Sequence, residues 1–282
     1  MIKIENLNFG YRKKEVLFNQ FNLALSPGNI YGLLGKNGAG KTTLLKLISG
    51  LLYPQTGVCT YNQILTFKRT PEFLSEIFFL PEISYLPAIK VKEYLEIYSL
   101  FYPRFDENKF YSHLKDFEIE SGKRLTSYSY GQKKKFSLAF ALAANTKIIL
   151  LDEPTNGLDI PAKSVFRKLV ASSIDDEKIF VISTHQVRDM KHLIDPILIL
   201  EKGEIIFNRQ IAEIEQKLSL EFMHEEPKPG QVLYYENTLG GFAVLNENNN
   251  GSENEIDIEL LFNAVVSDNQ KIRSLFHEEV TV

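Results

Sequence analysis

Hydrophobic residues along most of this chain fall into short uninterrupted runs that alternate with longer stretches at helical spacing. The run Ile148–Leu151 is apolar at every position, which is typical of a parallel strand buried on both faces. The pattern predicts strands of this kind at residues 30–34, 76–80, 148–151 and 178–183. It predicts helices at residues 44–52, 136–144 and 162–173. This alternation indicates an α/β fold.

Other segments of the first 208 residues have different patterns. Ile2–Leu7 and Phe21–Leu25 alternate polar and apolar residues at the period of a β-strand, so we expect β-structure at the N-terminus. Residues 83–130 change to helical spacing and predict a helical insertion, whose aromatic residues we expect to pack in a core. A hairpin signature at residues 197–207 predicts the end of the first domain near residue 208.

Residues 209–282 are interpreted as a separate C-terminal extension. Helical spacing at 211–218 and at 257–266 predicts two helices. Strand-like segments at 232–235 and 242–245 flank a glycine turn. We therefore expect a small α+β unit, and no motif in it indicates a role.

The composition narrows the classes of protein that the chain can belong to. The 282 residues are 44% hydrophobic and 24% charged, as in an ordinary globular protein. A net charge of −4 argues against a protein that coats nucleic acid by bulk electrostatics. Cys59 is the single cysteine, so a reducing cytosol is the simplest location. We expect no secretory signal, and no stretch reaches the roughly 18 apolar residues of a membrane helix.

Residues 35–43 carry the clearest candidate chemistry. Residues 35–42 fit the phosphate-loop pattern G-x-x-x-x-G-K-S/T, between a predicted strand and a predicted helix. Glycine permits positive φ and lets backbone N–H groups approach an anion, and the start of the helix adds its positive dipole end. In this pattern Lys41 lies against the β- and γ-phosphates of a nucleotide, and the Thr42 hydroxyl ligates magnesium.

Further polar side chains follow two of the predicted strands. Asp152 and Glu153 come directly after one buried strand, and Thr184 and His185 end another. Open α/β sheets bind ligands at the carboxyl ends of their strands. We therefore expect two carboxylates and a histidine at the same edge of the sheet as the phosphate loop.

The segment Ser129-Tyr130-Gly131-Gln132 opens a predicted helix and completes a recognisable set of motifs. Together with the phosphate loop, Asp152-Glu153 and His185, it resembles the ATP-binding-cassette (ABC) family, the nucleotide-binding subunits of ABC transporters. The resemblance covers residues 1–208. It implies an α/β P-loop NTPase core with an N-terminal antiparallel β-subdomain, an inserted α-helical subdomain and a small C-terminal α+β extension.

The resemblance also implies a role for each matched position. Asp152 would hold magnesium and Glu153 would orient or deprotonate the attacking water, while His185 and Lys41 would contact the phosphates. Such an arrangement suits phosphoryl transfer, which depends on positioning and on neutralising charge. The residues implied to bind the nucleotide, ATP, are Tyr11, Gly35, Lys36, Asn37, Gly38, Ala39, Gly40, Lys41, Thr42, Thr43, Ser129, Gly131, Gln132 and Asp159.

Some of these residues are implied to act between subunits. In the family, the segment that Ser129 and Gly131 match reaches the nucleotide of the opposite subunit, and Asp159 matches an aspartate that communicates across the dimer. One cassette per chain therefore implies a dimer, most simply of two copies. Tyr11 matches the aromatic residue that stacks on adenine. The lysines at 133–135 match basic residues that commonly follow the signature, and they also fit a solvated helix face.

Three positions depart from the family's pattern. Tyr128 and Tyr130 stand where the signature usually has Leu and its first Gly, which could alter turnover. Glu82 replaces the usual Q-loop glutamine, and its carboxylate can still approach a metal. The metal set implied is therefore Thr42, Asp152 and Glu82. Versions with Glu at this position occur among exporter-type cassettes, which favours export.

These features predict an ATPase subunit that dimerises on ATP and drives a separate integral membrane permease, most simply an exporter. We expect it in the cytoplasm, on the inner face of the membrane through the permease, without a nucleic-acid partner. The alternative is a soluble cassette ATPase acting on ribosomes or nucleic acid. Such proteins usually carry two cassettes or a long coiled coil, and this sequence has neither. A third hypothesis, prompted by the altered signature, is a nucleotide sensor with negligible turnover.

Overall fold

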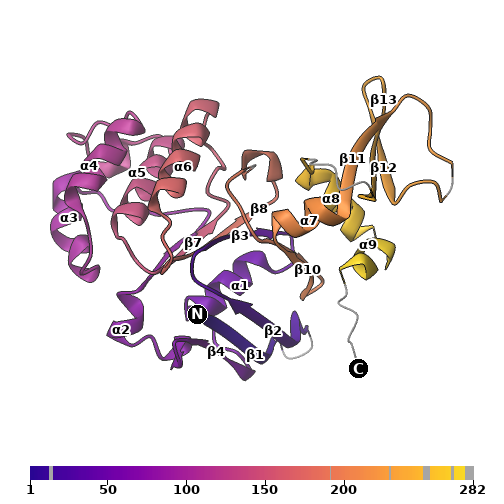
Figure 1. Cartoon of the computed structure of the whole chain (residues 1–282). Helices are drawn as coiled ribbons and strands as arrows, with labels where there is room; N and C mark the ends of the chain where they lie inside the picture. The colour runs from indigo at the N-terminus through magenta and orange to yellow at the C-terminus, as the bar shows by residue number, and fades with distance from the viewer. Residues whose placement is uncertain (13–14, 191, 229, 250–254, 268–269, 277–282) are drawn as a thin grey trace.

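The computed structural model describes residues 1–282 except 13–14, 191, 229, 250–254, 268–269 and 277–282 (Figure 1). Within the described residues the strands form three sheets. None of the helices in this part of the chain is long and apolar enough to cross a membrane. The predicted mixed α/β class is confirmed, with a mostly parallel sheet at the centre.

The central sheet contains the parallel strands that the sequence predicts. Its strands are β3 (Asn29–Leu34), β6 (Ile77–Leu80), β7 (Ile148–Asp152), β8 (Ile179–Thr184), β9 (Ile197–Glu201) and β10 (Glu204–Arg209). They lie in the order β10-β9-β3-β8-β7-β6, and only β10 runs antiparallel to its neighbour. Every residue of β7 and β8 is buried, because alternate side chains enter hydrophobic clusters on opposite faces of the sheet.

A second, antiparallel sheet covers one face of the central sheet. It consists of β1 (Ile2–Phe9), β2 (Phe18–Leu25), β4 (Thr56–Tyr61) and β5 (Ile64–Leu65), in the order β2-β1-β4-β5. The apolar residues of β1, β2 and β4 pack with helix α1 (Lys41–Ile48) and with one face of the central sheet. A 3₁₀ turn, η1 (Thr66–Lys68), and the short helix α2 (Pro71–Leu74) lead to β6. The N-terminal β-structure expected from the alternating pattern is confirmed.

Helices cover the other face and extend away from it (Figure 1). They are α3 (Val91–Tyr98), the 3₁₀ turn η2 (Ser99–Phe101), α4 (Glu107–Asp116), the 3₁₀ turn η3 (Leu125–Ser127), α5 (Tyr130–Ala143) and α6 (Ile160–Ser173). Several of the aromatic side chains pack against one another as predicted: the Tyr94 ring meets Phe136 and Phe140 edge to face and stacks on Tyr98. Tyr85 and Phe101 are exposed instead. This aromatic core joins α3 and α4 to α5.

The C-terminal residues form a small sheet and further helices. The elements are α7 (Ile211–Lys217), β11 (Leu218–Met223), β12 (Tyr234–Thr238), β13 (Gly241–Glu247), α8 (Ile258–Val266) and α9 (Gln270–Leu275). Strand β13 lies between β11 and β12. The α7 and α8 helices and the two strands around the glycine turn are confirmed. Strand β11 and helix α9 were not predicted: the helix predicted at residues 211–218 ends where β11 begins, and α9 is only six residues long.

The C-terminal part packs on the core rather than standing free. Helix α8 lies beside the 3₁₀ turn η4 (Val187–Met190), which directly follows the His185 loop. The Arg188 guanidinium and the Glu259 carboxylate pair at 2.6 Å across this contact. The Phe276 ring meets Phe207 of β10 edge to face at 5.1 Å.

Candidate functional site

The loop at residues 35–40 joins β3 to α1 and has a backbone that its glycines make possible. Gly38 and Gly40 have φ of +83° and +109°, in the left-handed region that glycine adopts without a Cβ penalty. Gly35 lies so close to β9 that a Cβ would be 2.6 Å from the Leu200 carbonyl oxygen. Gly40 is the N-cap of α1 and brings no capping side chain, so the first N–H groups of α1 can bind an anion.

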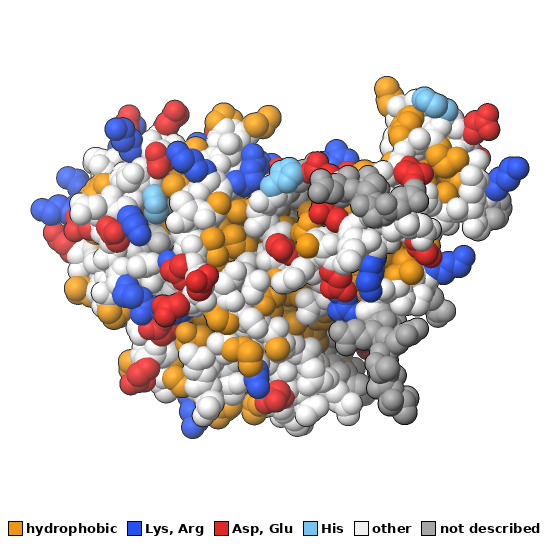
Figure 2. All heavy atoms as spheres, viewed as in Figure 1, with side chains coloured by type: hydrophobic (Ala, Val, Ile, Leu, Met, Phe, Trp, Pro, Cys, Tyr) orange, Lys and Arg blue, Asp and Glu red, His pale blue; other side chains and the backbone are white. Residues whose placement is uncertain are grey.

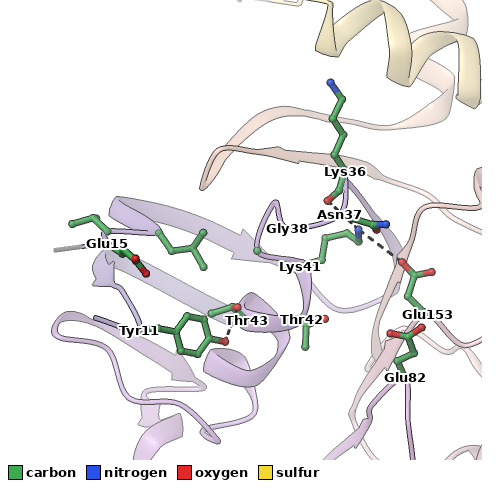
Figure 3. A pocket seen from close by; sticks show the side chains of 13 residues that line it. Tyr11, Glu15, Lys36, Asn37, Gly38, Lys41, Thr42, Thr43, Glu82 and Glu153 are labelled. Carbon is green, nitrogen blue, oxygen red and sulfur yellow. Dashed lines mark hydrogen bonds and ion pairs between the residues drawn. The ribbon is translucent and has the colours of Figure 1, made fainter. Parts of the chain in front are cut away.

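A pocket of about 430 Å³ lies next to this loop, a size typical of small-molecule sites (Figure 3). The predicted site residues that line it are Tyr11, Lys36, Asn37, Gly38, Gly40, Lys41, Thr42, Thr43, Glu82 and Glu153. Figure 3 shows Tyr11 on one side of the pocket and the two carboxylates, Glu82 and Glu153, on the other. Gly35 and Ala39 do not line the pocket, and a Cβ on Gly35 would meet the Leu200 carbonyl and the Ala39 side chain. Glu15, Val16 and Leu17 also line it and were not predicted.

Lys41 is the first residue of α1, and its side chain is buried against the loop. Its Nζ donates a hydrogen bond to the Gly35 carbonyl at 2.7 Å and lies 3.8 Å from Glu153 Oε1. Burial lowers the pKa of Lys41 from its ordinary value, and the negative charges of Glu153, Asp152 and Glu82 oppose that shift. A bound phosphate would add negative charge beside this ammonium and favour its charged form.

Asp152, at the end of β7, connects the loop to the central sheet. Its Oδ2 accepts a hydrogen bond from the Thr42 hydroxyl at 2.7 Å, and its Oδ1 accepts one from the Ser183 hydroxyl. Ser183 was not predicted as a site residue, although its place at the end of β8 was a usable signal. The group is made of hard oxygen donors, which suits a magnesium ion. No cluster of three or more His, Cys, Asp or Glu side chains that could hold a metal occurs among the described residues, so phosphate oxygens and water would have to complete the coordination.

Glu153 has a strained backbone and a central position. Its φ is +44°, in the left-handed region, and its N–H donates to the Ser183 carbonyl at 3.1 Å. Its Oε1 lies 2.8 Å from His185 Nδ1. Glu153 is therefore held between Lys41 and His185, and the structure brings these three predicted catalytic residues together.

Glu82 follows β6 and belongs to a second polar network at the edge of the pocket. Its Oε1 accepts a hydrogen bond from Asn156 Nδ2 at 2.9 Å. The Oδ1 of Asn156 accepts one from Gln186 Nε2 at 3.3 Å, next to His185. Asn156 and Gln186 were not predicted as site residues. Asn156 lies three residues after Glu153 and Gln186 directly follows His185, and this nearness in the sequence was the signal that could have found them.

Tyr11 presents its ring to the pocket. Its side chain is 62% exposed, its hydroxyl lies 2.9 Å from the Thr43 hydroxyl oxygen, and Phe9 supports the ring edge to face at 5.2 Å. An exposed ring held in this way can stack on a flat ligand.

Ser129, Gly131 and Gln132 lie at the start of α5, outside the pocket of their own chain. Ser129 Oγ accepts from the Gln132 N–H, and Gln132 Oε1 accepts from the Ser129 N–H, which together form a capping box. Asp159 does not line this pocket either. Its carboxylate accepts a hydrogen bond from the Ala162 N–H at the start of α6 and pairs with Lys135 at 3.3 Å.

The unusual tyrosines of the signature have separate structural roles. Tyr128 is buried, and its hydroxyl donates to the Glu120 carbonyl, so it fills a core position as a leucine would. Tyr130 is half exposed and covers Gly157, where an added Cβ would be 2.3 Å from the ring. Both signature tyrosines therefore make packing contacts within this chain.

The expectation of a solvated lysine face is wrong for Lys134. Lys134 is buried, because it lies on the same face of α5 as the buried residues Ser137, Leu138 and Ala141. Its neighbours Lys133 and Lys135 are partly exposed.

The chain is similar to known cassette proteins. The family model described as ABC transporter matches residues 18–156. The chain is 31% identical to the ABC transporter ATP-binding protein NatA of Bacillus subtilis over 212 residues, 72% of this chain and 86% of NatA. It is 30% identical to the molybdate import ATP-binding protein MolC of Haemophilus influenzae over 250 residues, 86% of this chain and 96% of MolC. A solved dimeric ATP-binding cassette in a post-hydrolysis state, bound to ADP and Pi, has a TM-score of 0.66 and 25% identity, covering 74% of this chain and 98% of that chain.

The residues that the family model matches include the phosphate loop, the start of α5 and the end of β7. The resemblance to the cassette family and the fold that it implies are both confirmed. The chain therefore belongs to the ABC transporter family as an ATP-binding subunit, and its activity is ATP hydrolysis.

Proposed function

We propose that residues 1–208 form an ATPase domain that binds ATP and magnesium, works as a homodimer and drives a membrane permease. The observation that carries the proposal is the contact network at the loop. Lys41, Thr42, Asp152, Glu153 and His185 come from three separate segments, and contacts between 2.7 and 3.8 Å connect these segments.

ATP binding is assigned to the loop and to Tyr11. The backbone N–H groups of residues 35–43 and the Lys41 ammonium would hold the β- and γ-phosphates. The exposed Tyr11 ring would receive the adenine. The ring needs only the π-face of a base, so this contact would discriminate weakly between ATP and other nucleoside triphosphates.

Magnesium is assigned to Thr42 and Asp152, with Glu82 nearby. A magnesium ion neutralises charge on the phosphates during phosphoryl transfer. Thr42 and Asp152 would hold the ion from the loop and from β7. The Glu82 carboxylate lines the same pocket and would act directly or through water.

Glu153 is assigned as the residue that orients or deprotonates the attacking water. Its carboxylate is buried and lies within reach of Lys41 and His185. Lys41 is placed to neutralise developing charge on the γ-phosphate, and His185 to contact the same group. Positioning of this kind suits a reaction in which the protein does little covalent chemistry.

The second subunit is assigned as another copy of this chain. Ser129 and Gly131 lie at the start of a helix, where N–H groups can bind a γ-phosphate, but they do not line the pocket of their own chain. A solved dimeric ABC transporter cassette that is 26% identical to this chain supports a dimer. In this proposal each copy supplies Ser129 and Gly131 to the pocket of the other. A homodimer is the simplest arrangement, because two copies of this chain are enough to form it.

The docking site for the permease is assigned to a groove between α2 and η2. This groove has a volume of about 870 Å³ and is lined by Leu51, Pro71, Leu74, Phe79, Leu100 and Phe101, among others. Leu100 is 80% exposed and Phe101 is 65% exposed, which is unusual for large apolar side chains without a partner. An apolar helix of a membrane protein would cover them. The subunit would then lie on the cytoplasmic face of the membrane.

Export is the proposed direction of transport, and Glu82 in place of glutamine is what favours it. The name of MolC refers to import, and a transport measurement that shows inward movement of a substrate would contradict export. Nucleic acid is not a proposed partner. Figure 2 shows acidic and basic side chains intermixed on the face in view, without the one-sign field that a nucleic-acid surface has.

The proposed function is tested by ATP hydrolysis and ATP binding of the purified chain, with Lys41→Ala as the matched inactive variant. We expect magnesium-dependent phosphate release that falls at least about 100-fold in Lys41→Ala, since a charged contact to the transferred group is lost. Equal rates in the two proteins would contradict the assignment. Copurification of the chain with a membrane protein from detergent extracts would test the permease separately.

A further inference from the structure

Lys134 connects the start of α5 to the edge of the pocket from inside the protein. Its side chain is 3% exposed. Its Nζ donates hydrogen bonds to the backbone carbonyls of Glu82 at 3.0 Å and of Pro81 at 3.5 Å. These carbonyls belong to the turn that follows β6, so a single buried side chain joins two segments that lie 52 residues apart.

An ammonium at this place is costly for folding. Burial lowers the pKa of Lys134 to about 8, and the negative charges of Asp152, Glu82 and Glu153 oppose that shift. A buried charge is unfavourable unless it is paired and hydrogen-bonded, and an apolar side chain of similar length often packs as well or better. Stability alone therefore does not explain a lysine among the buried residues of α5.

The turn that Lys134 holds carries a pocket carboxylate. Glu82 directs its side chain toward Asn156 at 2.9 Å and lines the pocket beside Glu153 (Figure 3). Strand β6 ends at Leu80, so Pro81 and Glu82 have no ladder partner in the sheet to fix them. The Lys134 ammonium holds the backbone carbonyls of this turn, while Asn156 holds the Glu82 carboxylate.

We propose that Lys134 is a positioning residue for the ATPase reaction, because its ammonium fixes the Pro81–Glu82 turn and so places the Glu82 carboxylate at the metal side of the pocket. Lys134 also lies two residues after Gln132 of the signature. A shift of α5 would move the Glu82 carboxylate, so the signature helix and the metal side of the same chain are mechanically linked. This inference rests on the proposed role of Glu82.

The test compares Lys134→Met with Lys133→Met, a matched change at the partly exposed neighbour on the same helix. Two quantities are measured on the purified chain: ATP hydrolysis, and the magnesium concentration that half-saturates binding of a fluorescent methylanthraniloyl ATP. The same two measurements are made on Glu82→Ala and on the double variant Glu82→Ala/Lys134→Met. Circular dichroism and melting temperature check that each variant is folded.

We expect Lys134→Met to raise the half-saturating magnesium concentration and to lower kcat by about tenfold each, as changes behind metal ligands do, with KM for ATP within about twofold. Lys133→Met should match the wild type. In the Glu82→Ala background the Lys134→Met change should have less than about a twofold further effect, because the carboxylate that it positions is absent.

Two results would overturn the proposal: Lys134→Met behaving like Lys133→Met, or a full tenfold effect persisting in the Glu82→Ala background. The second result would assign Lys134 a purely structural role. If Lys134→Met does not fold, Lys134→Gln replaces it under the same criteria. Failure of the proposed function is distinguishable, because it would show in the wild-type chain as absent nucleotide binding or as binding unchanged by Lys41→Ala.

Discussion

The Thr42 hydroxyl donates a hydrogen bond to Asp152 Oδ2 at 2.7 Å, although the two residues are 110 positions apart in the chain. Thr42 is the second residue of helix α1, which follows the phosphate loop, and Asp152 ends a strand buried on both faces. The other carboxylate oxygen of Asp152 is occupied by the Ser183 hydroxyl. A magnesium ion would enter at the Thr42–Asp152 contact, where two hard oxygen ligands already face each other.

Asp152→Asn is therefore expected to abolish the magnesium dependence of ATP hydrolysis. The amide oxygen can still accept the Thr42 hydrogen bond, so the fold should survive, but the ligand charge is lost. We expect a fall of about 100-fold or more in hydrolysis at saturating ATP. Removal of magnesium by a chelator should bring the wild type to the same low rate. A variant that keeps the wild-type rate and magnesium optimum would contradict the metal assignment.

Tyr11→Ala is expected to weaken ATP binding by about tenfold, since base stacking on an aromatic ring is worth about 1–3 kcal/mol. Tyr11→Phe is the matched control, because it keeps the ring and loses only the hydroxyl that contacts Thr43. We expect its ATP affinity to stay within about twofold of the wild type. Fluorescence titration with a methylanthraniloyl nucleotide measures both. Equal losses in the two variants would show that the hydroxyl, rather than the ring, carries the contact.

The sequence was sufficient to predict the fold class and most of the pocket, because the signals are local. A glycine-rich loop, an apolar run that ends in Asp152-Glu153 and a strand that ends before His185 can each be identified without knowledge of tertiary contacts. Their convergence follows from the geometry of a parallel sheet, whose carboxyl ends lie at one edge.

Other features could not be predicted, because they depend on contacts between distant segments. Lys134 looked like one of three exposed lysines. Only the packing of α5 brings its ammonium to the Glu82 carbonyl. The Asn156–Glu82 hydrogen bond joins residues 74 positions apart. Tyr130 looked like a defect in the signature, but its ring covers Gly157. Strand β11 is specified by pairing with β13 rather than by its own pattern.

The Tyr130–Gly157 contact predicts a coupling between two substitutions. Gly157 has a φ of +81°, and an added Cβ would be 2.3 Å from the Tyr130 ring. Gly157→Ala should therefore lower the free energy of unfolding by about 2–4 kcal/mol, from overpacking and from the positive φ. In the Tyr130→Ala background the same change should cost about half as much, because only the backbone strain remains. Urea unfolding measures all four proteins, and strict additivity would contradict the contact.

His113 predicts a pH dependence of stability. Burial in α4 lowers its pKa below the ordinary value of 6.5, and its Nδ1 is buried without a hydrogen-bond partner among the described residues. The unfolded chain then binds a proton here more readily than the folded chain. Stability is lost as the pH falls below about 6.5 toward the lower folded pKa. His113→Leu should lose less stability than the wild type between pH 7 and pH 5, measured by urea unfolding. Identical pH profiles would show that His113 is not the titrating group.

The central claim is that this chain forms only half of a working site, and Glu153→Gln tests it most directly. Loss of the water-directing carboxylate should lower hydrolysis by about 10²–10⁴-fold and leave the loop able to bind ATP. Size-exclusion chromatography with light scattering then measures the mass of Glu153→Gln without nucleotide, with ADP and with ATP. We expect a monomer in the first two conditions and a dimer with ATP. A monomer under conditions in which bound ATP is demonstrated would contradict the shared site.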